Sequence, residues 1–260
     1  MEYSESALNH GDAMKKTEKA FWDGTHKGHI RYRLPSSLNI GTSNILRLLE
    51  PHVAAGARVL EIGFAPGKIL AHLGLRCSAN VSGIDYSENG VAVAKELFQH
   101  LGLTGDLRCE DLFSSSFAAQ TFDFVFSLGF IEHFDNAAVV VERHFRFLKP
   151  GGRALIAIPN YGGIYGRLQS RLDPDNIEIH NLHIMRQDAL HRLADGFAVS
   201  ASRSYAYGRI NPWLLSLDRK LPGLVSSGLQ VAGNFVGLLQ PFDVTPLCPL
   251  LVLEFTRKSA

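Results

Sequence analysis

The sequence predicts a doubly wound α/β fold, in which helices cover both faces of a mostly parallel β-sheet. From residue 51 onward, short apolar runs alternate with longer segments of helical periodicity, which is typical of parallel strands joined by crossover helices. The chain has 260 residues, of which 46% are hydrophobic, and is long enough to bury a large core. No motif repeats at a fixed period, so a single structural domain is the simplest organisation.

Seven segments are the expected strands. The first five are short apolar runs at residues 58–62, 80–84, 107–109, 122–127 and 153–158. Segments 197–207 and 250–257 are expected to form two further strands. The sequence Leu148-Lys-Pro-Gly-Gly152 separates the fifth strand from the helix before it, because proline cannot continue a helix and glycine permits a turn.

Helical spacing predicts the elements that join these strands. Helices are expected at residues 36–50, 68–75, 88–101 and 136–148. In the last of them Val141, Phe145 and Leu148 share one face, and Asp135 could cap its start.

The connection between the last two strands is too long for a simple loop and should contain one or two helices. From Leu224 onward, the apolar residues Val231, Phe235 and Leu238 follow helical spacing between glycines. A core or dimer-packing helix is the expected interpretation. A hydrophobic ligand channel and membrane contact through residues 223–239 are the alternatives.

Composition excludes several classes of protein. Because 26 basic residues nearly balance 25 acidic ones, the chain has no broad electrostatic footprint for nucleic acid. The three cysteines are far apart and lack the paired spacing of zinc or redox sites. The first residues are acidic where a signal peptide would be basic. These features predict a cytoplasmic protein with a small partner.

The most informative segment is Val59-Leu-Glu-Ile-Gly-Phe-Ala-Pro-Gly-Lys68, where an apolar strand runs into a turn of small residues and then a helix. The small residues occupy positions 63, 65 and 67, which is not the spacing of a dinucleotide-binding fingerprint. A carboxylate at Glu61 would repel a pyrophosphate and would suit a ligand with an ammonium group. The loop therefore predicts a partly cationic cofactor.

This loop resembles the first motif of the class I S-adenosylmethionine-dependent methyltransferases, Glu/Asp-x-Gly-x-Gly-x-Gly. It is matched by Glu61, Gly63, Ala65 and Gly67, with alanine in place of the middle glycine. Further matches follow in order, so that the resemblance covers roughly residues 55 to 160. It implies S-adenosyl-L-methionine as cofactor and a seven-stranded sheet whose last strand is antiparallel.

The resemblance assigns further cofactor contacts. Asp85 ends the second strand and would accept hydrogen bonds from the ribose hydroxyls, and Tyr86 would pack on the adenine side. Asp111 would lie near the adenine amino group and Leu112 against the ring. Ser127 would lie beside the cofactor. A capping role for Asp111 and an ordinary buried strand end for Ser127 are the alternatives.

Histidines are the candidates for the acceptor side. The resemblance places Glu132-His133 where acceptor and methyl group meet, and His133 is the candidate general base, with packing at a helix start as the alternative. His180 and His183 would share one face if their segment is helical and could form a substrate wall. No metal site is expected, because no third ligand stands at a diagnostic spacing.

Aromatic residues complete the predicted acceptor pocket. Tyr161 follows the fifth strand in a glycine-containing loop, and Trp22 and Tyr32 precede the first predicted helix of the core. The predicted organisation is an N-terminal lid and helix at 1–50 and a methyltransferase domain at 51–260. Within that domain we expect a cofactor half at 55–160 and acceptor-side additions at 160–196 and 208–249.

These features together predict an enzyme that transfers a methyl group from S-adenosyl-L-methionine to an oxygen, nitrogen or carbon of a small-molecule acceptor by in-line displacement. An RNA or lipid methyltransferase is one alternative, and a non-catalytic partner subunit that keeps the cofactor pocket is another. The near-zero net charge weighs against a nucleic acid partner. A homodimer is compatible with the sequence.

Overall fold

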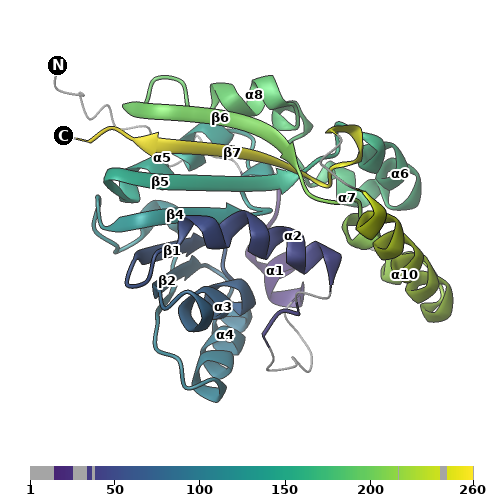
Figure 1. Ribbon diagram of the computed structural model, residues 1–260, viewed down its shortest axis with the longest axis horizontal. Coiled ribbons are helices and arrows are strands. Elements are labelled where there is room, and N and C mark those ends of the chain that lie inside the picture. The colour runs from purple at the N-terminus through teal and green to yellow at the C-terminus, as the bar shows by residue number, and fades with distance from the viewer. Residues whose placement is uncertain (1–14, 26–33, 37–38, 216, 241–244, 260) are drawn as a thin grey trace.

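The computed structural model describes residues 15–25, 34–36, 39–215, 217–240 and 245–259. Seven strands form one sheet in the order β3-β2-β1-β4-β5-β7-β6 (Figure 1). They are β1 (Arg58–Ile62), β2 (Asn80–Asp85), β3 (Asp106–Cys109), β4 (Phe122–Leu128), β5 (Leu148–Pro159), β6 (Val199–Tyr207) and β7 (Leu250–Arg257). β1 to β5 run parallel, and β7 is antiparallel to both of its neighbours. The predicted fold is confirmed.

Helices connect the strands much as the spacing predicts. They are α1 (Lys19–Thr25), α2 (Ile40–Leu49), α3 (Lys68–Arg76), α4 (Glu88–His100), α5 (Ala137–Phe147), α6 (Ile164–Leu172), α7 (Pro174–Glu178), α8 (Gln187–Arg192), α9 (Leu217–Lys220) and α10 (Gly223–Leu239). The predicted cap at Asp135 is wrong. Asn136 is the N-cap residue of α5 without a side-chain cap bond, and Asp135 instead pairs with Lys16.

Two apolar clusters cover the two faces of the sheet. Val59, Phe124 and Phe126 pack with helices α2, α3 and α4 on one face, whereas Leu60 and Val125 pack with α5 and α8 on the other. All five side chains are at most 1% exposed. Because successive residues of a strand point to opposite faces, a strand buried on both faces needs a continuous apolar run, which is the pattern seen in the sequence.

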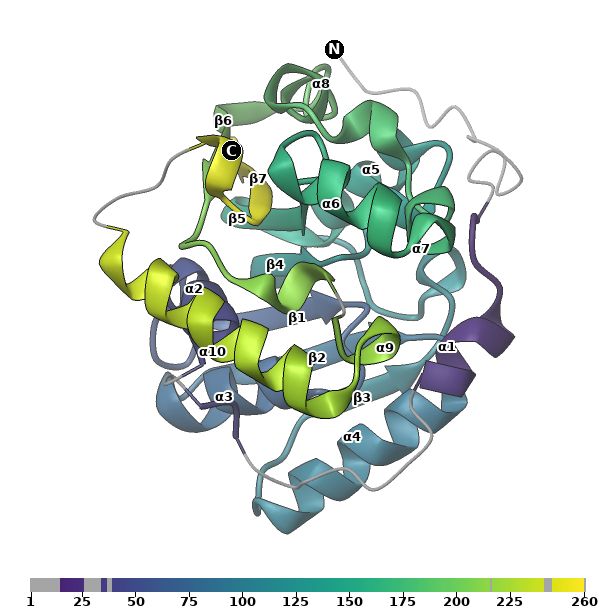
Figure 2. The ribbon, with the colours of Figure 1, turned by 90° about the vertical axis from the view of Figure 1, so that its right-hand side faces the viewer.

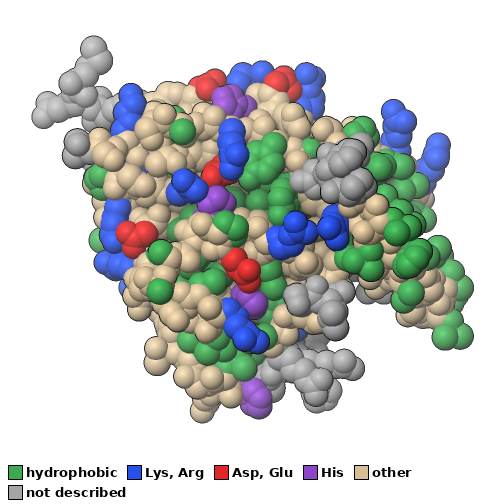
Figure 3. Space-filling view, in the orientation of Figure 1, with side chains coloured by type: hydrophobic (Ala, Val, Ile, Leu, Met, Phe, Trp, Pro, Cys, Tyr) green, Lys and Arg blue, Asp and Glu red, His purple; other side chains and the backbone are tan. Residues whose placement is uncertain are grey.

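Helix α10 does not join either core, so the core half of the expected core or dimer-packing helix is wrong, and dimer packing stays a prediction. Among its described residues only Ser226 and Gly237 are buried, while Leu224 is 92% and Phe235 62% exposed. The side toward the protein carries glycine: a Cβ at Gly237 would collide with the carbonyl oxygen of Ile210. Since the small residues face inward, the large apolar ones face outward, as the green side chains over α10 show in Figure 3. Within the described residues, no helix is long and apolar enough to cross a bilayer.

The carboxyl ends of the parallel strands meet at one edge of the sheet. Figure 2 looks onto that edge and shows α6, α7, α9 and α10 gathered there. In open α/β sheets ligands bind outside the carboxyl ends of the strands. The fold therefore places the expected ligand site at the carboxyl ends of the parallel strands.

Candidate cofactor and acceptor site

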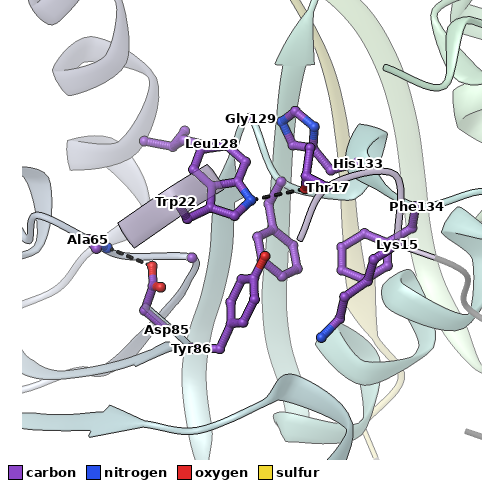
Figure 4. A pocket seen from close by; sticks show the side chains of 12 residues that line it. Lys15, Thr17, Trp22, Ala65, Asp85, Tyr86, Leu128, Gly129, His133 and Phe134 are labelled. Carbon is purple, nitrogen blue, oxygen red and sulfur yellow. Dashed lines mark hydrogen bonds between the residues drawn. The ribbon is translucent and has the colours of Figure 1, made fainter. Parts of the chain in front are cut away.

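A pocket lies at the carboxyl ends of β1, β2 and β4 (Figure 4). Gly63 and Ala65 line it from the loop after β1, and Asp85 and Tyr86 from the end of β2. Residues 128–130 contribute the end of β4, and the described N-terminal segment closes one side with Lys15, Thr17 and Trp22. The pocket thus joins the predicted cofactor loop to the predicted lid.

The loop after β1 depends on two glycines in the left-handed region of backbone conformation, Gly63 at φ +73° and Gly67 at φ +80°. A Cβ at Gly63 would lie 2.5 Å from Cδ2 of Phe130, which lines the pocket. A Cβ at Gly67 would lie 2.9 Å from Cβ of Ala94 in α4. Gly63 therefore shapes the pocket, whereas Gly67 starts α3 and allows close packing against α4.

Asp85 ties the two cofactor loops together. Its Oδ2 accepts a hydrogen bond from the Ala65 amide at 3.0 Å, and its Oδ1 accepts one from the Ser87 amide at 2.9 Å. A carboxylate has about four lone-pair sites, so these two bonds leave room for further donors such as ribose hydroxyls. The position predicted for ribose recognition is therefore preorganised by backbone amides.

Glu61 supplies a buried carboxyl group near the end of β1. It is buried, and its Oε2 has no hydrogen-bond partner. Burial, and secondly the charge of Asp85, raise the pKa of Glu61 well above its ordinary value. A cationic group nearby would relieve this penalty. Glu61 therefore fits the ammonium group of S-adenosylmethionine, as the sequence predicts for this position.

The described N-terminal residues lie across the pocket. Trp22 donates from Nε1 to Thr17 Oγ1 at 3.0 Å, and its ring lies edge-on to the His133 ring with centroids 5.0 Å apart (Figure 4). Lys15 pairs with Asp111 and lies 4.6 Å from the ring centroid of Tyr86. The structure thus places the predicted substrate residue Trp22 against the pocket, while Tyr32 lies outside the described residues.

Five predicted cofactor residues are absent from the pocket lining: Glu61, Gly67, Asp111, Leu112 and Ser127. The last three have structural partners elsewhere. Asp111 caps a short 3-10 turn by accepting from the Phe113 amide at 2.9 Å, and Leu112 belongs to the core. Ser127 Oγ lies 2.9 Å from His144 Nε2, while His144 Nδ1 donates to the Val140 carbonyl at 2.8 Å. These contacts agree with the structural alternatives for Asp111 and Ser127.

Acceptor-side candidates meet behind the pocket. His133 lines the pocket, and its ring centroid is 4.7 Å from that of His180. Tyr161 lies edge-on to His180 at 5.2 Å, and its hydroxyl accepts from Asn176 at 3.1 Å. Burial, and secondly the neighbouring His180, lower the pKa of His133 to about 4, so the ring is neutral near pH 7.

His183 is the exception, since the structure does not bring it to this group. The helix α7 ends at Glu178, and a separate 3-10 turn begins at Leu182. His180 is therefore buried and His183 exposed, so the two do not form one wall. The expected common face required a continuous helix.

Asn181 joins the segment around His180 to the loop after β4, a role that its position in the sequence does not predict. Its amide donates to the Glu132 carbonyl at 2.7 Å, and its side chain donates to the carbonyls of Phe134 and Asp135, both at 3.0 Å. A polar residue between two histidines was the only sequence signal. These bonds hold the segment around His180 against the loop after β4.

Glu132 lies next to His133 and is completely buried. Neither of its carboxylate oxygens has a hydrogen-bond partner, and burial raises the pKa of Glu132 to about 8. A buried polar group without partners is costly. Such a group next to His133, which lines the pocket, is a candidate for a role in binding or chemistry.

Residues 60–156 match the family model of a methyltransferase domain, and this stretch contains the loop after β1 and the ends of β2 and β4. The chain carries a class I S-adenosylmethionine-dependent methyltransferase domain. S-adenosylmethionine is the cofactor that this domain implies, and Glu61, Gly63 and Asp85 fit it. A ubiquinone biosynthesis O-methyltransferase from Dechloromonas aromatica is 35% identical over 109 residues, which are 41% of this chain and 46% of that protein.

Solved structures share this methyltransferase fold. Phosphoethanolamine N-methyltransferase 2 from Haemonchus contortus, solved with phosphomonomethylethanolamine and S-adenosylhomocysteine, has a TM-score of 0.58 at 17% identity, over 84% of this chain and 52% of that one. The [4+2]-cyclase SpnF has a TM-score of 0.57 at 17% identity, over 84% of this chain and 82% of that one. The chain aligns with about half the length of the first curated relatives it matches.

Proposed function

We propose that this protein transfers the methyl group of S-adenosylmethionine to an oxygen, nitrogen or carbon atom of a small-molecule acceptor. The observation that carries the proposal is the pocket in which Gly63, Ala65 and Asp85 meet Trp22 and His133. The cofactor loops and the acceptor-side residues there face one cavity within a methyltransferase domain.

The bound cofactor supplies an electrophilic methyl group on a sulfonium. Glu61 and Asp85 hold and orient it, since a buried carboxylate suits its ammonium group and a preorganised carboxylate suits its ribose. Trp22 covers the pocket beside His133 and excludes water from the reacting atoms. Positioning of this kind supplies much of the rate enhancement of a group transfer.

His133 can take a proton from the acceptor. Its Nδ1 donates to the Ile179 carbonyl at 3.0 Å, because a carbonyl can only accept, and the lone pair of the neutral ring is therefore on Nε2. The weak basicity of a buried imidazole suits an acceptor that is already acidic. We therefore favour a phenol or another acidic hydroxyl over an unactivated alcohol.

The experiment supplies purified protein with methyl-labelled S-adenosylmethionine and fractionated extract of its source cells. Release of S-adenosylhomocysteine together with label in a small organic molecule supports the proposal. The variant Asp85→Ala should abolish both signals, whereas Asp188→Asn, at an exposed ion pair remote from the pocket, should leave them unchanged. If no fraction ever releases S-adenosylhomocysteine, the proposal is wrong.

A lipid acceptor is the second candidate, and helix α10 is the observation that favours it. Its side chains Leu224, Val231 and Phe235 are exposed, and Figure 2 shows the helix at the edge of the sheet that holds the carboxyl ends of the parallel strands. An exposed apolar surface on this side of the sheet suits a ligand with a hydrocarbon tail. Label found in the organic phase of the fractionated extract would select this candidate.

A role without methyl transfer is the third candidate, and SpnF illustrates that the fold is compatible with it. That protein shares the fold and is described as a [4+2]-cyclase, and a fold by itself does not fix the reaction. Binding of S-adenosylmethionine without release of S-adenosylhomocysteine from any extract fraction would select this candidate.

A further inference from the structure

We propose that Glu132, His133 and His180 form a binding site for one divalent transition-metal ion at the acceptor side of the pocket. Each residue offers one ligand atom, and these atoms lie within 4.8 Å of one another. All three residues are buried, with exposed fractions of 0%, 7% and 8%. Exposed acidic clusters often hold no ion, but this group is buried and contains two imidazoles.

Both rings are oriented for ligation by backbone carbonyls. His133 Nδ1 donates to the Ile179 carbonyl, and His180 Nδ1 donates to the Asn176 carbonyl. Because each Nδ1 carries the hydrogen, each Nε2 carries a lone pair. Histidine ligands of metal ions commonly donate their other ring N–H to a carbonyl or carboxylate in this way.

Glu132 supplies the negative charge that a cation requires. Both of its carboxylate oxygens are buried without hydrogen-bond partners, although the backbone carbonyl of the same residue accepts from the Asn181 amide at 2.7 Å. The backbone carbonyl of Glu132 thus has a hydrogen-bond partner, whereas its carboxylate oxygens have none. A metal ion would complete its coordination and offset the cost of burying it.

The donor set limits the choice of ion. Two imidazoles and one carboxylate suit zinc and related transition metals, and three protein ligands leave an open position. Bonds of about 2.1 Å in tetrahedral geometry would separate the ligand atoms by about 3.4 Å. Side-chain shifts of roughly an ångström would close the present arrangement onto an ion.

The site also narrows the class of acceptor, and this step rests on the proposed function. His133 lines the pocket, so the open position of the ion would face the acceptor. Such a position favours an acceptor that carries an oxygen donor at or beside the methylated atom. In the metal-bound protein His133 would be a ligand, and the ion would take over the activation of that oxygen.

The test measures metal binding directly on the full chain, after treatment with a chelator and its removal. Zn²⁺ is titrated calorimetrically, and Co²⁺ is added to a second sample to record its visible absorption spectrum. We expect one Zn²⁺ per chain and the intense Co²⁺ absorption of a tetrahedral site. The variants Glu132→Gln and His180→Gln should each weaken Zn²⁺ binding at least tenfold, in line with the loss of a ligand.

The matched control is His183→Gln, which removes an exposed histidine three residues away and should leave the Zn²⁺ affinity unchanged. The melting temperature is a second readout, which would reveal a variant that fails to fold. Without metal, Glu132→Gln should melt at or above the temperature of the natural protein, because it removes a buried carboxyl group. With Zn²⁺, the natural protein and His183→Gln should both gain melting temperature, whereas Glu132→Gln should gain much less.

The metal proposal is overturned if the natural protein binds no stoichiometric Zn²⁺, or if His183→Gln weakens binding as much as His180→Gln. Calorimetry with S-adenosylhomocysteine on the same samples separates the two proposals. Zinc binding by a protein that never binds or turns over cofactor would refute the proposed function and keep the metal site. Cofactor turnover by a protein that does not bind zinc would support the proposed function and refute the metal site.

Discussion

Gly63 and Gly56 show how one residue type serves two purposes in this chain. Both lie in the left-handed backbone region, at φ +73° and φ +76°. A side chain at Gly63 would strike Phe130, whereas nothing lies within 4 Å of the corresponding position at Gly56. Backbone conformation requires both glycines, and only Gly63 is also required by the pocket.

Alanine substitutions should separate these two requirements. Gly56→Ala should lower the free energy of unfolding by about 1–2 kcal/mol, the cost of a Cβ in the left-handed region, and leave cofactor affinity intact. Gly63→Ala should cost more and weaken S-adenosylhomocysteine binding at least tenfold, because it displaces Phe130. Urea unfolding and calorimetry check both effects, and equal binding by the two variants would contradict the assignment of Gly63.

His144 is the residue whose burial should be visible in the pH dependence of stability. Burial lowers its pKa from 6.5 to about 4, so between these pH values the unfolded chain binds more protons than the folded one. Stability contributed by the neutral ring is therefore present above pH 6.5 and is lost as the pH falls toward 4. The loss between pH 7 and pH 5 should be about 2 kcal/mol.

The variant His144→Gln isolates this contribution from those of other groups. It keeps a polar partner for Ser127 but cannot titrate. Urea unfolding measures the free energy of unfolding at pH 7 and at pH 5. The decrease between the two should be about 2 kcal/mol smaller for His144→Gln than for the natural protein. Identical pH profiles for the two proteins would show that His144 titrates normally in the folded state.

At the scale of elements, the sequence predicts the strands and most helices correctly, and α10 shows the limit of periodicity. Apolar spacing identifies a helix with an apolar face but does not say whether the rest of the protein covers that face. The covered side of α10 is decided by Gly233 and Gly237, which lie against Pro212 and Ile210. Contacts with residues outside the helix therefore decide which face is covered, and periodicity alone cannot predict them.

Substitutions on α10 should be nearly neutral for folding. Phe235→Ser changes a side chain that is 62% exposed and should alter the free energy of unfolding by less than about 0.5 kcal/mol. Leu253→Ala in β7, at 0% exposure, should cost about 2–5 kcal/mol. Urea unfolding measures both. A cost above about 2 kcal/mol for Phe235→Ser, dependent on protein concentration, would indicate that a second copy covers the helix.

The whole molecule couples cofactor binding to stability, because the pocket is built from four separate segments: residues 15–22, 63–65, 85–86 and 128–134. Unfolding scatters these segments and destroys the site. A ligand that binds only the folded state stabilises it according to its concentration. Folding and cofactor recognition are therefore linked across the whole sheet edge.

S-adenosylhomocysteine at 100 times its dissociation constant should raise the free energy of unfolding by about 2.7 kcal/mol. Asp85→Ala should lose most of this gain, because Asp85 orders both cofactor loops, whereas Asp188→Asn should keep it. Thermal unfolding with and without ligand makes the comparison. An undiminished gain in Asp85→Ala would show that the carboxylate does not hold the ligand.

The sequence by itself determined the order of strands and helices, the loop after β1 and the cofactor. The order of elements follows from local periodicity, and the cofactor from the resemblance of the motif around Glu61 and Gly63 to a known family. The grouping of Glu132 with His180 was decided only in the tertiary structure, because 47 intervening residues separate them and no spacing pattern encodes their contact. The same holds for the exposed face of α10, since burial depends on what the rest of the folded chain places against a surface.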